Sequence, residues 1–196
     1  WLAWNWVSLE RYQQRLASGL KLSAIGGSDF HQPDRLLPEG PLVLARPTTV
    51  LWLPELSEDA ILAAMKSGHG YITESPSGPH LELRSGDAVM GGTARDLGAV
   101  DVIVRGAAGD RLVLVDADGV LADIEIASEH WQTSVPVSSP RLFVRAEVVA
   151  EHSRERLVAE FTATLDGREL PWQLKGADLA QQPIRRALSN PIYVET

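Results

Sequence analysis

A carboxylate and an imidazole stand two residues apart in residues 25–31, which read Ile-Gly-Gly-Ser-Asp-Phe-His. In extended backbone, residues i and i+2 point to the same side, so Asp29 and His31 would face one site while Phe30 points away into packing. Carboxylate oxygen and imidazole nitrogen are ligands that suit zinc, manganese or iron. Asp29 and His31 are therefore the candidate metal ligands of this chain.

The same pair also has a simpler interpretation. A loop Asp commonly caps a turn of the backbone, and the His beside it would then be solvated. Two ligands also do not complete a catalytic zinc site, which has three protein ligands and a water. The remaining histidines are expected at the surface or at strand edges and supply no third ligand; they are His69, His80, His130 and His152.

The first part of the chain reads as helices alternating with strands. Apolar residues at spacings of three and four predict a helix over residues 5–18, and Gly19 is suited to end it. A short buried strand is predicted over residues 22–25, which would place the ligand pair near its carboxyl end. Further along we expect a strand over 48–53, a helix over 58–66 between Ser57 as N-cap and Gly68, and a strand over 71–73. This order is typical of α/β or α+β folds.

From about residue 78 the pattern changes to short strands separated by turns. Asp118-Gly119 indicates a hairpin. It is not an EF-hand calcium loop, because the sixth position counted from Asp116 is Leu121 and not Gly. Strands are predicted over 81–84, 100–104, 112–115, 121–126, 131–137, 142–149, 156–161 and 192–194. Their spacing predicts a β-sandwich, so we expect two domains, residues 1–78 of α/β type and residues 79–196 of all-β type.

Composition excludes several classes of function. The formal net charge of -8 argues against a nucleic-acid partner and against an anionic membrane. No apolar run approaches the roughly 20 residues of a membrane-spanning helix. The chain has no cysteine, which rules out thiolate metal sites and fits a reducing compartment, so the cytoplasm is slightly favoured. The chain opens Trp-Leu-Ala-Trp without a Met, and we expect it to be a piece of a longer protein.

The motif Gly-Gly-Ser-Asp-Phe-His at residues 26–31 resembles the last metal-binding motif of PHP (polymerase and histidinol phosphatase) domains. The preceding helix over residues 9–19, the strand over 47–52 and the helix over 56–68 are similar to the elements around that motif in the family. The closing Ser-Asn-Pro-Ile-Tyr-Val at 189–194 resembles the end of the carbaryl-hydrolase-like (CehA/McbA) branch.

This resemblance implies that residues 1–78 are the C-terminal part of a distorted (β/α)7 barrel with a polynuclear site for two or three divalent ions, zinc, manganese or iron. Asp29 and His31 match the last two ligands of the family. The earlier ligands, among them a His-x-His pair, would come from a missing N-terminal barrel portion. A metal-activated water would attack a small-molecule phosphoester, carboxylester or carbamate, and Asp29 would also act catalytically by taking a proton. The chain alone is expected to be inactive.

Two other functions stay open. The β-sandwich suits a binding module for a carbohydrate or a protein, and the chain also suits a remnant whose parent has lost catalysis. A His-x-His in the parent would favour the enzyme, and a concave aromatic strip on the sandwich would favour the binding module. An exposed barrel edge invites a partner chain, so a homo-oligomer is also compatible with this sequence.

Overall fold

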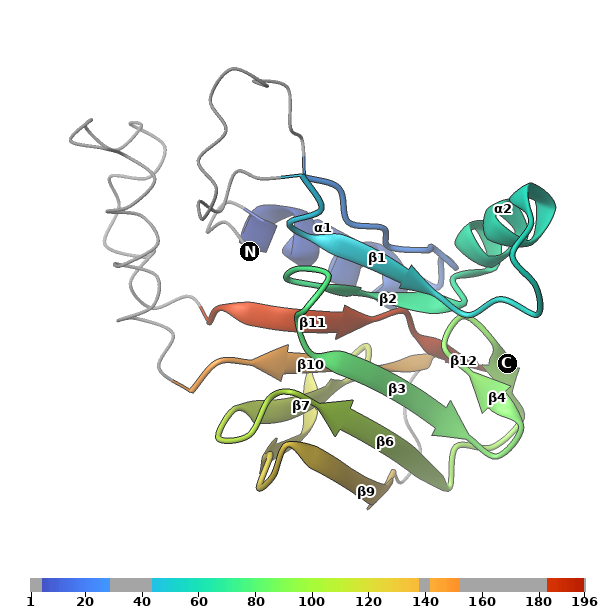
Figure 1. Ribbon diagram of the computed structural model, residues 1–196. Coiled ribbons are helices and arrows are strands. Elements are labelled where there is room, and N and C mark those ends of the chain that lie inside the picture. The colour runs from blue at the N-terminus through green and yellow to red at the C-terminus, as the bar shows by residue number, and fades with distance from the viewer. Residues whose placement is uncertain (1–4, 29–43, 138–141, 152–182, 196) are drawn as a thin grey trace.

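The computed structural model describes residues 5–28, 44–137, 142–151 and 183–195 (Figure 1). In chain order these residues form α1 (Asn5–Ala17), β1 (Thr48–Leu51), α2 (Glu58–Ser67), β2 (Gly70–Thr73), β3 (His80–Ser85), β4 (Ala88–Val89), β5 (Thr93–Ala94), β6 (Ala99–Arg105), β7 (Arg111–Val115), β8 (Val120–Glu125), β9 (His130–Pro136), β10 (Phe143–Val149), β11 (Arg185–Ser189) and β12 (Ile192–Val194). Neither helix is long and apolar enough to cross a membrane, as far as the described residues go.

The strands form two sheets. The larger, eight-stranded sheet has the order β1-β2-β11-β10-β12-β5, with β7 and β8 attached through β10, and the smaller sheet has the order β4-β3-β6-β9. Every described strand pair is antiparallel except β12 with β5, which is parallel. The described part of the chain is therefore mostly β, and it is compatible with the predicted β-sandwich.

Alternation of side chains along the strands builds the core between the two sheets. On β3, Leu81 and Leu83 are fully buried, whereas their sequence neighbours His80, Glu82 and Arg84 are partly or fully exposed. Each such side chain contributes about 1.5–3 kcal/mol relative to an exposed position. The matching residues of the other strands are Val100, Val102 and Val104 of β6, Leu112 and Leu114 of β7, and Val144, Ala146 and Val148 of β10.

The helix α1 packs on the other face of the larger sheet (Figure 1). Its two buried residues, Leu9 and Leu16, lie one above the other on one face, as a spacing of seven predicts. Leu9 packs with Ile72 of β2 and Leu188 of β11, and Leu16 packs with Phe143 of β10 and Tyr193 of β12. Both helices end as predicted, because Gly19 and Gly68 have positive φ angles of 88° and 76°. The predicted cap is also present, since the Ser57 hydroxyl accepts a hydrogen bond from the Ala60 amide at 3.2 Å.

The prediction of a buried strand over residues 22–25 is wrong. These residues form no regular strand, and Ile25 is 56% exposed. The strand predicted over 156–161 lies outside the described residues. The short β4 and β5 and the buried β11 were not predicted, and β11 was missed because it begins with two arginines, which do not look like a strand in the middle of a sheet.

A barrel remnant in residues 1–78 is not supported by the described residues. Strands β1 and β2 pair with each other antiparallel, whereas successive strands of a β/α barrel are parallel. Strand β2 also pairs antiparallel with β11, near the end of the chain. One sheet thus includes strands from both sides of residue 78, and the division into two domains at that residue stays a prediction.

Candidate functional site

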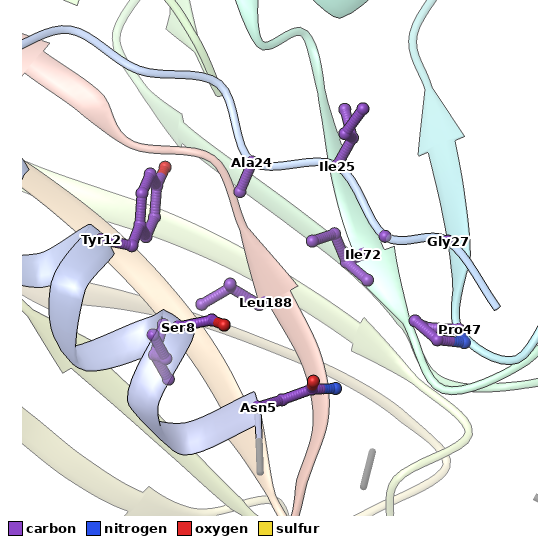
Figure 2. Close-up of a pocket in the computed structure, with 11 residues that line it drawn as sticks. Asn5, Ser8, Tyr12, Ala24, Ile25, Gly27, Pro47, Ile72 and Leu188 are labelled. Atoms are coloured by element: carbon purple, nitrogen blue, oxygen red, sulfur yellow. The ribbon is translucent and has the colours of Figure 1, made fainter. Parts of the chain in front are cut away.

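The predicted metal ligands Asp29 and His31 lie outside the described residues. The structure describes the chain up to Ser28 and resumes at residue 44. Residues 22–28 lead into Asp29, and we call them the approach segment. It runs past α1 on one side and β2 on the other (Figure 2).

Side chains from the larger sheet hold alternate residues of the approach segment. The Tyr193 hydroxyl accepts from the Leu22 amide at 2.9 Å and donates to the Leu22 carbonyl at 3.0 Å. The Thr49 hydroxyl accepts from the Gly26 amide at 2.8 Å and donates to the Gly26 carbonyl at 2.9 Å. Between these two, the side-chain amide of Asn190 binds both backbone groups of Ala24. Three side chains thus provide the hydrogen bonds that the backbone of a neighbouring strand would otherwise provide.

Asn190 is the central and most buried of these anchors. It lies between β11 and β12 and is 3% exposed. Its Oδ1 accepts from the Ala24 amide at 2.7 Å, and its Nδ2 donates to the carbonyls of Ala24 at 3.2 Å and of Gly70 at 3.1 Å. A single side chain therefore ties the approach segment to the start of β2. Sequence reasoning missed this role, because an Asn before a Pro reads as a turn residue.

Two tyrosines of this region remain hydrogen-bond donors at neutral pH. Burial raises the pKa of Tyr12 far above its ordinary value, and the nearby Tyr193 raises it further. Burial also raises the pKa of Tyr193. Both hydroxyls lie within hydrogen-bonding distance of the Leu22 carbonyl, Tyr12 at 3.2 Å and Tyr193 at 3.0 Å. The start of the approach segment is therefore held in the same way across the physiological pH range.

The two consecutive glycines of the motif have different surroundings, and this yields a prediction. A Cβ on Gly26 would lie 2.5 Å from Ile72 Cγ2 and 3.1 Å from Pro47 Cγ, whereas a Cβ on Gly27 would meet nothing within 4 Å. We expect Gly26→Ala to lower the free energy of unfolding by about 1–3 kcal/mol, the usual cost of overpacking. The matched control Gly27→Ala should change it by less than about 0.5 kcal/mol. Urea denaturation of both variants measures this, and equal values would contradict the close approach of Gly26 to β2.

A cavity of about 290 Å³ opens beside the approach segment (Figure 2). Residues of α1 form one wall, the approach segment and Pro47 form the other, and the sheet contributes the floor. None of the described residues that line it carries a charge; they are Asn5, Ser8, Leu9, Tyr12, Ala24, Ile25, Gly26, Gly27, Pro47, Ile72 and Leu188. The described lining therefore suits an apolar group with a few hydrogen-bonding atoms.

The described residues do not complete a metal site. No three His, Asp or Glu side chains gather in this part of the chain in a way that could hold an ion. The imidazole of His80 is engaged with Tyr71 and Glu82, and His130 lies exposed at the start of β9. The Asp and His of the motif have donor atoms that suit zinc, manganese or iron, but they are two ligands only. His152 lies outside the described residues.

The loop at Asp116 is the hairpin turn that the sequence predicts. The Asp116 carboxylate accepts from the backbone amides of Asp118 at 2.7 Å and Gly119 at 3.1 Å. Gly119 has a φ of 134°, and the loop joins β7 to β8. Backbone amides occupy one oxygen of this carboxylate, as in other Asx turns.

Comparison with known proteins yields no relative. No protein-family model matches the chain, no curated protein resembles it closely enough to be counted as similar, and no solved structure does.

Proposed function

We propose that this chain is the C-terminal part of a metal-dependent hydrolase in which Asp29 and His31 are two of the metal ligands. The observation that carries the proposal is the anchoring of the approach segment at Leu22, Ala24 and Gly26, immediately before the ligand pair. A ligand pair needs a rigid support, because metal geometry tolerates only small displacements. The approach segment is not a strand, but three side chains hold it by hydrogen bonds over the five residues 22–26, and this gives the ligand pair such a support.

The remaining ligands must come from residues other than the described ones, since those hold no complete site. The proposal therefore concerns the parent protein, and the chain alone is expected to be inactive. A bound divalent ion would supply an acidified water as the nucleophile. The chain's own contribution is to hold two of the ligands and to line one side of the substrate site.

The uncharged cavity bears on the class of substrate. Carboxylesters and carbamates carry an apolar alcohol or amine portion, whereas phosphomonoesters carry a dianion that arginine or lysine ordinarily binds. Among the described residues, neither Lys nor Arg lines the cavity beside Gly26 and Gly27. We therefore favour an ester or carbamate with an apolar group over a phosphomonoester.

The test is the metal content of the purified parent protein, measured by mass spectrometry. We expect two or three equivalents of zinc, manganese or iron, and their loss in the double variant Asp29→Ala/His31→Ala. The double variant Asp87→Ala/His130→Ala is the matched control, because it also removes one carboxylate and one imidazole, both from exposed positions. It should keep its metal.

Hydrolysis of aryl esters, aryl carbamates and aryl phosphates by the same three proteins then tests the substrate class. Activity on the first two should fall at least a thousandfold in the Asp29→Ala/His31→Ala variant and stay unchanged in the control. Equal metal content in all three proteins would refute the assignment of Asp29 and His31 as ligands.

A further inference from the structure

The smaller sheet ends at a long strand, β9, which pairs on one side only. In the order β4-β3-β6-β9, this strand pairs with β6 and, as far as the described residues go, with no other strand (Figure 1). Its seven residues make it the longest described edge strand, since β1 has four, β4 and β5 have two each and β8 has six. A long edge strand is a template for a further strand, because a row of its N–H and C=O groups points away from the sheet.

Hydrogen bonds at the two ends of the β6–β9 pair show which backbone groups of β9 point outward. The carbonyl of Glu129 accepts from the Gly106 amide at 3.0 Å, and the amide of Val137 donates to the Gly98 carbonyl at 3.3 Å. Residues that bond to one neighbour alternate along an antiparallel strand, and the register between these ends is unbroken, so the odd-numbered residues face β6. The even-numbered residues therefore direct their backbone groups to the free edge; these are His130, Gln132, Ser134 and Pro136.

This edge lacks the charged side chains that usually protect an edge strand. None of the seven residues of β9 is Lys, Arg, Asp or Glu, whereas β8, the edge strand next in length, carries Asp123 and Glu125. The one histidine of β9, His130, stands at its end. Because the whole chain has a formal net charge of -8, an uncharged edge is a place where two copies approach with little repulsion.

Two residues near the ends of β9 make the edge complementary to itself. Pro136 has no N–H, so it presents only a carbonyl to the free edge. At the other end, the outward carbonyl of His130 already accepts from the Ser128 hydroxyl at 3.0 Å. Antiparallel pairing of two such edges about Thr133 places Pro136 opposite His130. The missing donor then faces an acceptor that is already bound.

We propose that β9 pairs antiparallel with β9 of a second copy of this chain, about a twofold axis at Thr133. The two four-stranded sheets then form one continuous sheet. The backbone groups of Gln132 bond to those of Ser134 in the second copy, and the His130 amide donates to the Pro136 carbonyl. Every outward amide of the strand thus finds an acceptor.

Side chains support the same register. Thr133 lies opposite Thr133 of the second copy, and Trp131 lies opposite Val135. Pairs of threonines and pairs of an aromatic with a β-branched residue are favourable across strands. Trp131 and Val135 already pack against the core between the sheets, so they are held in place before the copies meet.

The neighbouring strands bring no like charges together. On β6, Arg105 and Asp101 are the charged residues in the rows that cross the new pair. In those rows the second copy presents Ala99 on the side opposite Arg105, and Ile103 on the side opposite Asp101. This match of the edge with itself, in backbone groups, side chains and charge, favours a second copy over an unrelated peptide.

Single cysteines test the pairing directly, because the chain has no cysteine of its own. The two Thr133 residues form a non-hydrogen-bonded pair with Cα atoms about 4.5 Å apart, whereas the two Ser134 residues lie diagonally at about 7–8 Å. A disulfide spans Cα separations of about 4.4–6.8 Å, so under mild oxidation Thr133→Cys should form the intermolecular disulfide at least about tenfold faster than Ser134→Cys. Random collisions would give the opposite order, since Ser134 is exposed and Thr133 is half-buried.

Sedimentation equilibrium of the purified protein and of two variants at Gln132 supplies the second measurement. The wild type should form a dimer whose fraction rises with concentration. Gln132→Pro should raise the dissociation constant roughly thirtyfold, because it removes two hydrogen bonds between the copies and none within the sheet. The matched control Gln132→Ala keeps its amide and should dimerise as the wild type does. If Gln132→Pro does not fold, the comparison of the two cysteine variants still decides.

Three results overturn the proposal. They are a wild type that stays monomeric at every concentration, equal rates of disulfide formation at the two cysteines, and equal dissociation constants for Gln132→Pro and Gln132→Ala. A protein that stays monomeric but binds an unrelated strand-forming peptide would assign the edge to a foreign partner and not to a second copy.

Discussion

Replacing Glu147 by Gln is expected to lower the free energy of unfolding by about 3–5 kcal/mol, the cost of breaking a buried ion pair from one side. Glu147 lies on β10, and its side chain is 4% exposed. One oxygen binds Arg145, whose side chain is 3% exposed, and the other accepts from Arg185 Nε at 2.5 Å. The glutamine would remove the carboxylate charge that these two guanidinium groups share.

Chemical denaturation of the wild type and the variant measures this difference. Glu125→Gln is the matched control, because Glu125 is exposed on β8, and its loss should change stability by less than about 0.5 kcal/mol. Similar destabilisation of the two variants would show that the ion pairs of Glu147 with Arg145 and Arg185 contribute no more to stability than a surface charge does.

The same residue should produce a measurable pH dependence. Burial alone would raise the pKa of Glu147, but the charges and hydrogen bonds of Arg145 and Arg185 outweigh it, so the pKa lies below the ordinary 4.5. A carboxyl whose pKa is lowered on folding stabilises the protein above its unfolded pKa, and this contribution is lost as pH falls through the folded value. Between pH 6 and 3 the wild type should therefore lose more stability than Glu147→Gln. Parallel curves would contradict the lowered pKa.

Replacing Asn190 by Ala is expected to lower the free energy of unfolding by about 2–4 kcal/mol, at about 1 kcal/mol for each of three lost hydrogen bonds. It removes the side-chain partner of both backbone groups of Ala24, and the Gly70 carbonyl keeps the backbone amide of residue 190 but loses the side-chain donor. The effect should also be visible locally, because the Ala24 amide should lose its protection from hydrogen exchange.

The control for this variant is Gln132→Ala on the exposed side of β9, which should leave both stability and exchange at Ala24 unchanged. If Asn190→Ala destabilises the protein but Ala24 stays protected, then Asn190 supports the sheet alone and does not anchor the approach segment. If the parent binds metal as proposed, the same variant should also weaken that binding, because the support of Asp29 and His31 is loosened.

Local patterns in the chain predicted most of the elements correctly. The helix over residues 58–66, its cap at Ser57 and its end at Gly68 follow from residues adjacent to one another, and the structure confirms them. Local patterns predicted three of the four strands of the smaller sheet, β3, β6 and β9, for the same reason, since side chains of a strand point to opposite faces whatever the strand pairs with. The hairpin at Asp118-Gly119 is likewise a property of four residues.

Interactions between distant residues decided the rest. Residues 22–25 of the approach segment were predicted as a strand from their apolar character, but the backbone partners of this segment are side chains that lie 10 to 171 positions away. The antiparallel pairing of β2 with β11, which does not support a barrel remnant, joins Ile72 to Leu188. Neither could be found from spacing along the chain, because nothing local specifies which strand lies beside another.

By itself, the sequence determined where both helices and most of the strands lie, and it singled out Asp29 and His31 as residues whose types suit a metal. Their role stays a prediction. Only the tertiary structure decided which sheet the early strands join, that Gly26 must be a glycine because Ile72 lies against it, and that Tyr71, His80 and Glu82 meet. The physical reason is that side-chain type and periodicity act over a few residues, whereas packing and hydrogen bonding join residues that only the complete fold brings together.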